Sequence, residues 1–326
     1  MTNSINTIDN NNLNMLNECK LCNRNCKVNR NNDETGFCKA SNKVKIAKAF
    51  LHPWEEPPIS KGNGSGTVFF SHCNFNCVFC QNYDISQGIT EIQNPNCKTS
   101  VIGIDVSIER LSEIFFELQE KGANNINLVT PTHYVPQIIE ALKIAKKNNL
   151  NVPILYNTNG YDSIEAIKAL NGYIDVYLPD FKYFNDKYAL KYSKVSNYAS
   201  NTIKVIDEMV NQVGTPKFDS EGRIIKGVIV RHLMLPGLLF DSKKIVDLLY
   251  NRYGNNIYIS LMNQYVPMFN ACNYPEINKR LNPKHYDSLI NYALELGVTN
   301  GFIQDEGSNT TDFIPSFNLD GILKSQ

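Results

Sequence analysis

The chain has 326 residues, of which 42% are hydrophobic, enough for one large globular domain or a barrel with a small appendage. Its 32 Lys and Arg residues balance its 32 Asp and Glu residues, so no net positive field attracts nucleic acid or an anionic membrane. No apolar run reaches the roughly 18 residues of a membrane span, and the polar N-terminus lacks the apolar core of a signal peptide. We therefore predict a cytoplasmic protein with no membrane partner, and we disfavour a nucleic-acid substrate.

The N-terminal region divides into a lead-in and a cysteine-rich segment. Residues 1–16 are rich in Asn and low in complexity, which predicts an unstructured lead-in with no role in packing. Residues 17–60 hold too little apolar surface to fold alone, so a bound metal would supply the missing stability. The candidate ligands form the pattern C-x2-C-x3-C-x11-C and are Cys19, Cys22, Cys26 and Cys38.

Four thiolates in this pattern are compatible with more than one centre. Zinc is favoured by its preference for four ligands, an auxiliary 4Fe-4S cluster is equally sensible chemically, and four unmetallated thiols are the third alternative. Further along the segment, His52, Glu55 and Glu56 stand close together among three prolines. They are compatible with acid–base or ligand roles, but we favour a rigid, extended connection that ends in a solvated turn.

A second cysteine group follows the apolar strand TVFF. Cys73, Cys77 and Cys80 form a C-x3-C-x2-C loop. Three thiolates on so short a loop can bind three corners of a 4Fe-4S cubane and leave the fourth iron without a protein ligand, which indicates chemistry and not electron storage alone. Phe79 would shield one cluster face from water. The alternatives are three ordinary buried thiols or a cramped zinc site that takes His72 as its fourth ligand.

Helical and strand patterns alternate from this loop to the end of the chain. Strands alternating with helices predict a parallel sheet of right-handed βαβ units. The expected fold class is α/β, a partial (β/α)6 TIM-like barrel over residues 61–310 with a C-terminal tail at 311–326. The predicted helices cover 107–122, 135–147, 163–170, 186–213, 242–250 and 283–296, and the predicted strands cover 126–130, 152–156, 174–182, 226–237, 256–267 and 299–305.

Polar residues gather at the carboxyl end of strand after strand, the end that carries the active site in parallel β/α barrels. His133 and His232 can act as ligands or proton donors, although a lone histidine is more often structural. Asp180 and Lys182, two residues apart on one strand, can neutralise each other. Arg231 can bind a carboxylate or pair with Asp180. The remaining cysteines, Cys97 and Cys272, lack partner spacing and are expected to be buried or free thiols.

The cysteine loop and its aromatic residue resemble the cluster loop of the radical SAM superfamily. The resemblance implies that the open iron chelates the amino and carboxylate groups of S-adenosylmethionine, and that an electron from the reduced cluster cleaves it to a 5′-deoxyadenosyl radical. The Gly-Gly-Glu stretch that usually contacts the methionine amine is absent, and Pro-Thr-His stands in its place. The cofactor contacts implied by the resemblance are Thr130, Thr132, His133, Asn157, Thr158, Asn159, Asp180, Lys182 and Arg231.

Other stretches resemble the branch that includes pyruvate formate-lyase activating enzyme. They are TNG at 158–160, the Asp-x-Lys of PDFK, and RHLMLPG. The stretches CKLCNRNC, EEPPIS and LPDFKY are closer to the PflX-type homologues of that branch, and the resemblance covers about residues 19–305. It implies hydrogen abstraction that activates a glycyl-radical enzyme, with a low-potential flavodoxin or ferredoxin as electron donor.

Two departures from that branch keep other functions open. Residues 81–106 hold one cysteine and no ferredoxin-like insert, and the N-terminal cysteine segment has no counterpart in the activating enzymes. One alternative is radical modification of a small molecule or peptide. Another is a non-catalytic iron–sulfur or metal-binding protein, against which the polar residues at the strand ends argue.

Overall fold

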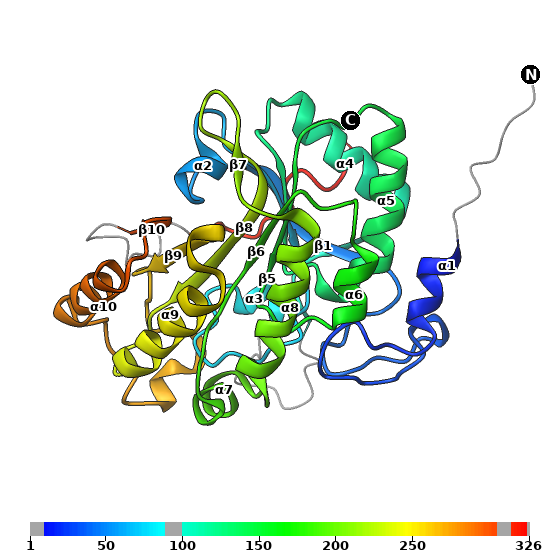
Figure 1. The fold of residues 1–326 in the computed structure, drawn as a ribbon. Helices are drawn as coiled ribbons and strands as arrows, with labels where there is room; N and C mark the ends of the chain where they lie inside the picture. Colours follow the sequence, from blue (N-terminus) through cyan, green and yellow to red (C-terminus); the bar gives the residue numbers. More distant parts are fainter. Residues whose placement is uncertain (1–9, 89–99, 305–313, 325–326) are drawn as a thin grey trace, which may run out of the picture.

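A mostly parallel sheet forms the centre of the structure, a computed structural model that describes residues 10–88, 100–304 and 314–324 (Figure 1). Strands whose side chains are buried along their whole length, such as Ile154–Thr158 and Val176–Pro179, are covered on both faces, as parallel strands usually are. Within the described residues the parallel strands are β2 (Ser65–Phe70), β4 (Ile126–Val129), β5 (Ile154–Thr158), β6 (Val176–Pro179), β8 (Ile224–Leu233), β9 (Tyr258–Met262) and β10 (Gly301–Ile303).

The sheet is open and is extended by antiparallel strands. Its order is β10-β9-β8-β6-β5-β4-β2-β1-β3, with β1 (Val44–His52) antiparallel to both β2 and β3 (Ile104–Val106). The short β7 (Lys217–Phe218) pairs with β8. In the described part of the chain the two end strands of this order do not pair with each other, so the barrel does not close. The predicted partial barrel is confirmed.

Helices connect the parallel strands and lie on the outside of the sheet (Figure 1). Ser107 and Ser163 cap two of them by accepting a backbone N–H three residues further on, which satisfies a donor at the first turn. The longer helices are α4 (Ile108–Glu120), α5 (Val135–Lys147), α6 (Ile164–Ala169), α7 (Asp186–Ser193), α8 (Tyr198–Val213), α9 (Leu239–Tyr253) and α10 (Pro283–Leu296). Short elements are α1 (Asn10–Leu13), α2 (Pro57–Ser60), α3 (Tyr83–Ser86) and 3-10 turns at Asn14–Leu16, Arg30–Asn32, Thr132–Tyr134, Gly254–Asn256 and Phe269–Asn273.

The predicted helix over 186–213 is broken into α7 and α8. Lys194 and Asn197 adopt the left-handed conformation, with φ of 57° and 52°, which no α-helix can continue through. The Asp186 carboxylate accepts the backbone N–H groups of Asn197 and Tyr198, at 2.7 and 2.9 Å, and so caps the start of α8. The amphipathic pattern continues across the break, and for this reason the sequence predicts one long helix.

Two features of the N-terminal region differ from expectation. The lead-in packs against the barrel: Leu16 is buried, α1 contacts α5, and Asn12 Nδ2 donates to Glu140 Oε1 at 2.9 Å. Residues 1–9 lie outside the described part. The sequence pattern also does not predict β1, which joins the sheet beside β2, because its polar residues and the prolines after it are typical of a connection.

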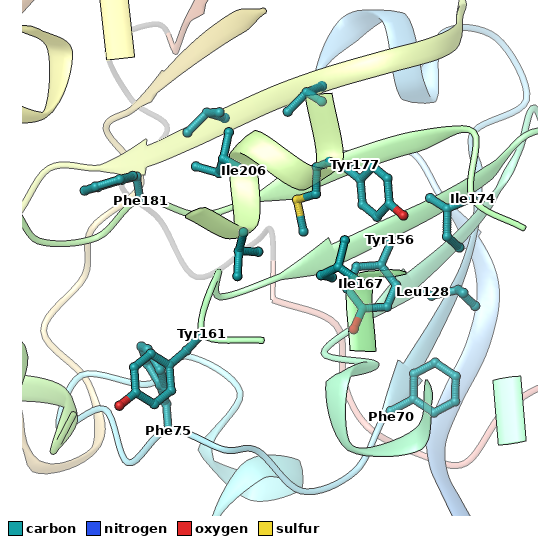
Figure 2. Close-up of a cluster of buried hydrophobic side chains, with 14 of the residues drawn as sticks. Phe70, Phe75, Leu128, Tyr156, Tyr161, Ile167, Ile174, Tyr177, Phe181 and Ile206 are labelled. Atoms are coloured by element: carbon teal, nitrogen blue, oxygen red, sulfur yellow. The ribbon is translucent and has the colours of Figure 1, made fainter. Parts of the chain in front are cut away.

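The core lies between the sheet and the helices (Figure 2). Tyr156 on β5 and Tyr177 on β6 meet edge to face, with their ring centroids 5.9 Å apart. Ile167 on α6 and Ile206 on α8 are fully buried in the same cluster. This packing fixes the strand ends from which the polar residues project. Among the described residues, no helix combines the length and apolar character needed to span a membrane.

Candidate active site

A cavity of about 380 Å³ lies at the carboxyl ends of the parallel strands. The polar residues that the sequence places at these ends converge on it, as predicted for a β/α barrel. The cysteine loop forms one wall, directly after β2. Of the predicted metal and cofactor residues, those that line it are Cys73, Cys77, Cys80, Thr130, Asn157, Thr158, Asn159, Asp180, Lys182 and Arg231.

The cysteine loop is held by the end of α7, which is far from it in the sequence. The backbone N–H of Asn76 donates to the carbonyl of Ser193 at 3.2 Å, and that of Val78 donates to the carbonyl of Tyr192 at 2.9 Å. Carbonyls in the last turn of a helix lack partners within the helix, so they are free to accept these bonds. The break between α7 and α8 therefore positions the loop.

Each sulfur of the loop has a hydrogen-bond partner. Ser193 Oγ lies 3.0 Å from Cys77 Sγ, and Ser86 Oγ lies 3.3 Å from Cys80 Sγ. The backbone N–H of Phe75 donates to Cys73 Sγ at 3.4 Å. Hydrogen bonds of this kind stabilise thiolate ligands and influence the potential of a cluster.

The donor set of the loop fits an iron–sulfur cluster. Burial raises the pKa of all three thiols, that of Cys77 to about 12, so the loop becomes thiolate only when a metal supplies positive charge. In the described part of the chain, no three His, Cys, Asp or Glu side chains converge closely enough to hold a single metal ion. Three thiolates on one loop are ligands that suit an iron–sulfur cluster, and the zinc alternative with His72 stays a prediction.

Four charged side chains form a continuous network beside the loop. Asp180 receives Lys182 Nζ at 2.6 Å on one oxygen and Arg231 Nε at 3.1 Å on the other. Arg231 also contacts Glu55 Oε2 at 3.4 Å and donates to Asn157 Oδ1. Burial alone would raise the pKa of Asp180, but the two cations outweigh it and hold the pKa below its usual value. Both pairings proposed for Asp180 are confirmed.

Glu55 lines the cavity, although the sequence analysis favoured a solvated turn over an acid–base or ligand role for it. Its side chain is only 10% exposed, and its Oε1 accepts from Asn127 Nδ2 at 2.8 Å, so the predicted solvated turn is wrong for this residue. Burial raises the pKa of Glu55 to about 7, against the opposing effect of Arg231. A carboxylate after a strand, among prolines, gives no local signal of burial, because its partner Arg231 is 176 positions away.

The residues that replace the Gly-Gly-Glu stretch do not all face the cavity. Thr130 lines it with a positive φ of 58°. Thr132 is buried, with its Oγ1 3.3 Å from Thr158 Oγ1. His133 turns to the other side of the cysteine loop, where its Nε2 lies 2.8 Å from the Ser71 carbonyl. Contacts of these three residues with a cofactor stay predictions, and the position of Thr130 suits one best.

Two further residues link the strand ends to the loop or to the core. Asn159 Nδ2 donates to Asn74 Oδ1 at 2.6 Å and lies 3.7 Å from Cys73 Sγ, which ties the TNG stretch to the cysteine loop. His232 is buried between the Phe181 carbonyl, at 2.7 Å from Nδ1, and Ser242 Oγ, at 2.9 Å from Nε2. The structural interpretation of His232 therefore fits better than a ligand role.

The other cysteines lie outside this cavity. Cys19, Cys22, Cys26 and Cys38 are free thiols that line a second, smaller cavity behind the loop. Cys272 is exposed and free, as expected for a thiol without partner spacing, and Cys97 lies outside the described residues.

Comparison with known proteins adds the family. A model of the radical SAM superfamily matches residues 67–249, a range that contains all three loop cysteines. An uncharacterized protein of Methanocaldococcus jannaschii is 32% identical over 288 residues, which cover 86% of this chain and 75% of that protein.

Solved structures with a similar fold are more distant. SuiB of Streptococcus suis bound to S-adenosylmethionine has a TM-score of 0.47 at 14% identity over 72% of this chain and 48% of its own. The FeFe-hydrogenase maturase HydG of Carboxydothermus hydrogenoformans has a TM-score of 0.47 at 14% identity over 71% and 50%. The chain thus spans about half the length of these solved structures. Because the family model matches more than half of the chain, including the cysteine loop, the chain belongs to the radical SAM superfamily.

Proposed function

We propose that this protein activates a partner enzyme by abstracting a hydrogen atom from a backbone glycine. The coarser activity follows from membership of the radical SAM superfamily, whose enzymes use a 4Fe-4S cluster and S-adenosylmethionine for radical chemistry. When bound, these two groups supply a one-electron cleavage of the sulfonium that yields a 5′-deoxyadenosyl radical. Cys73, Cys77 and Cys80 would hold the cluster, and the polar residues of the same cavity would hold S-adenosylmethionine.

The observation that carries the proposal is the meeting of three activase-like motifs in one cavity. Asn159 of TNG follows β5, the Asp180–Lys182 pair follows β6 and Arg231 lies on β8, yet all line the cavity beside the loop. The two cations and two carboxylates of the network balance each other. Lys182 and Arg231 therefore keep fixed orientations when an anionic group binds beside them. Such preorganised polar groups orient a charged ligand at little additional cost.

Two exposed apolar side chains that line the cavity support a macromolecular substrate. Trp54 is 60% exposed and Ile303 is 49% exposed, and both line the cavity. Exposed aromatic and aliphatic side chains at a binding site are typical anchors of protein–protein contacts. They support a partner loop that delivers glycine into the cavity, and we propose a low-potential flavodoxin or ferredoxin as electron donor.

The first test is an anaerobic assay of the coarse activity. The protein is reconstituted with iron and sulfide, reduced with dithionite and mixed with S-adenosylmethionine, and 5′-deoxyadenosine is measured by chromatography. We expect product from the wild type and from Cys272→Ala, which changes an exposed thiol outside the cavity, and none from Cys77→Ala. Equal product from Cys77→Ala would contradict the assignment of the loop.

The second test addresses the substrate. Each encoded glycyl-radical enzyme is co-expressed with this protein, and electron paramagnetic resonance is used to look for a glycyl radical. A signal that depends on Cys77 supports the proposal, and no signal with any candidate refutes it. Radical modification of a small molecule or peptide is then the second candidate. It is favoured by the N-terminal cysteine segment, whose Arg24 Nε donates to the Asn74 carbonyl of the cluster loop at 2.9 Å.

A further inference from the structure

The N-terminal cysteines share one cavity, although up to 19 positions separate them in the chain. Backbone hydrogen bonds hold their turns: the Cys19 N–H donates to the Val28 carbonyl and the Cys19 carbonyl accepts from the Lys27 N–H, at 2.9 Å each. Cys22 forms an isolated backbone bridge with Asp162, in the connection that follows β5. The segment is thereby fixed to the barrel. Each of the four thiols is free, and none forms a disulfide.

The backbone approaches one of these sulfurs closely. The N–H of Phe37 donates to Cys26 Sγ at 3.4 Å, the same distance as the N–H bond to Cys73 in the cluster loop. A Cβ atom on Gly36 would lie 2.8 Å from Cys26 Sγ, so a larger residue there would push the chain away from the thiol. Amide donors aimed at sulfur are what a thiolate ligand requires.

Two arginines beside the thiols lack a carboxylate partner. Arg30 is fully buried, and within the described part of the chain its guanidinium donates to the carbonyls of Ser41 and His133 and to no carboxylate. Arg24 stacks on the Phe37 ring, with 3.6 Å between its guanidinium carbon and the ring centroid. Neither forms a salt bridge within residues 10–88, 100–304 and 314–324. Because an arginine stays charged when buried, the cavity needs a negative charge to balance it.

Two hydrogen-bond donors point to the same conclusion. Arg24 Nη2 is buried and has no acceptor in the described structure, the Asn74 side chain reaches the Cys22 thiol, and both residues line the cysteine cavity. Buried donors without acceptors are rare in folded proteins, because leaving one unpaired costs free energy, and a bound ligand or ion can supply the acceptor. The four cysteines that line the same cavity would supply such acceptors as thiolates.

We propose that Cys19, Cys22, Cys26 and Cys38 bind a metal centre as four thiolates, with Arg24 and Arg30 balancing its negative charge. Four thiolates around a metal core with two positive charges carry a net charge of about −2, which the two positive guanidinium groups of Arg24 and Arg30 would balance. Among the described residues, no three sulfurs converge closely enough for a single ion, and the loop that carries the superfamily's cluster shares this wider spacing. The spacing favours an iron–sulfur cluster over one zinc ion. This centre does not depend on the proposed function.

The decisive experiment removes the loop ligands and counts the metal that stays. The triple variant Cys73→Ala, Cys77→Ala, Cys80→Ala is purified anaerobically at full length, and iron, sulfide and zinc are measured per chain. We expect about four iron and four sulfide per chain, the content of one cubane. About one zinc per chain would keep the four-thiolate centre and overturn the cluster assignment. Neither metal above background, together with four thiols at these positions that react freely with a thiol reagent, would overturn the proposal.

Matched variants show where the metal is bound. Cys22→Ser with Cys26→Ser in the triple variant should abolish the remaining metal, whereas Cys272→Ser should retain it in full. If the double change prevents folding, Arg24→Gln keeps every thiol and removes only the charge. We expect several-fold faster release of the metal to a chelator from Arg24→Gln, and release at the wild-type rate would contradict the charge-balancing role.

Discussion

Ser193 Oγ lies 3.0 Å from Cys77 Sγ, although the two residues stand 116 positions apart in the chain. Ser193 is the last residue of α7, and its carbonyl also accepts the backbone N–H of Asn76 in the cysteine loop. The end of one helix thus holds both the backbone and a sulfur of the loop. Its hydroxyl is fixed in turn by Tyr183 Oη, at 2.7 Å.

Ser193→Ala should make the midpoint potential of the loop cluster more negative. The hydroxyl stabilises electron density on the sulfur, and the reduced cluster, which carries more negative charge, loses more when the bond is removed. Potentiometric titration followed by electron paramagnetic resonance measures the shift. Tyr183→Phe is the control, because it removes the bond to Ser193 and leaves the bond to sulfur. Equal potentials in wild type and Ser193→Ala would argue against this role.

Glu55→Gln should change the pH dependence of stability. Glu55 has a pKa of about 7 in the folded protein because of burial, against about 4.3 in an unfolded chain. Since the folded pKa is raised, the stability contributed by the protonated group is complete below about pH 4 and is lost as pH rises through about 7.

The wild type should therefore lose stability relative to Glu55→Gln between about pH 5 and pH 8, by at most about 3 kcal/mol. Urea unfolding of both proteins at several pH values measures the difference, which isolates Glu55 from other titrating groups. Parallel curves across this range would show that Glu55 keeps an ordinary pKa.

Arg231→Met should destabilise the fold strongly. The arginine is 12% exposed and is the partner of both Asp180 and Glu55, so its removal leaves the buried Glu55 without a cation and Asp180 with Lys182 alone. Breaking a buried pair in this way costs about 3–5 kcal/mol. Arg252→Met is the matched control, because its ion pair with Asp207 is far more exposed and is worth at most about 1 kcal/mol. Similar urea midpoints for the two variants would show that the buried network contributes little.

Gly160→Ala should damage the site more than Gly172→Ala. Both glycines have positive φ, 79° and 84°, so each change strains the backbone by roughly 1 kcal/mol. A Cβ at Gly160 would also lie 2.7 Å from the Asp180 carbonyl, whereas nothing stands within 4 Å at Gly172. We expect Gly160→Ala to lower both thermal stability and 5′-deoxyadenosine formation, and Gly172→Ala to lower stability slightly. Equal effects of the two substitutions would mean that backbone strain alone explains the requirement for glycine at position 160.

Local patterns account for what the sequence predicted correctly. The spacing of Cys73, Cys77 and Cys80 is a property of eight consecutive residues, and the helix at 135–147 follows from apolar side chains repeated every three or four positions. The alternation of strands and helices then predicts the parallel sheet, and the parallel sheet predicts that polar residues meet at its carboxyl edge.

The corrections come from packing between distant segments. Residue spacing does not show that β1 joins the sheet between β2 and β3, since its pattern fits an exposed connection equally well. It also does not show which side of the loop receives His133, because that depends on how the strand end turns.

The sequence by itself determined the superfamily, the spacing of the three-cysteine loop and the fold class, because each depends on order along the chain. Only the tertiary structure decided that Glu55 joins Arg231 in the candidate active-site cavity, and that Arg30, which forms no salt bridge with another described residue, is buried near the four N-terminal thiols. The physical reason is that charge balance in a buried site is set by side chains brought together across many elements.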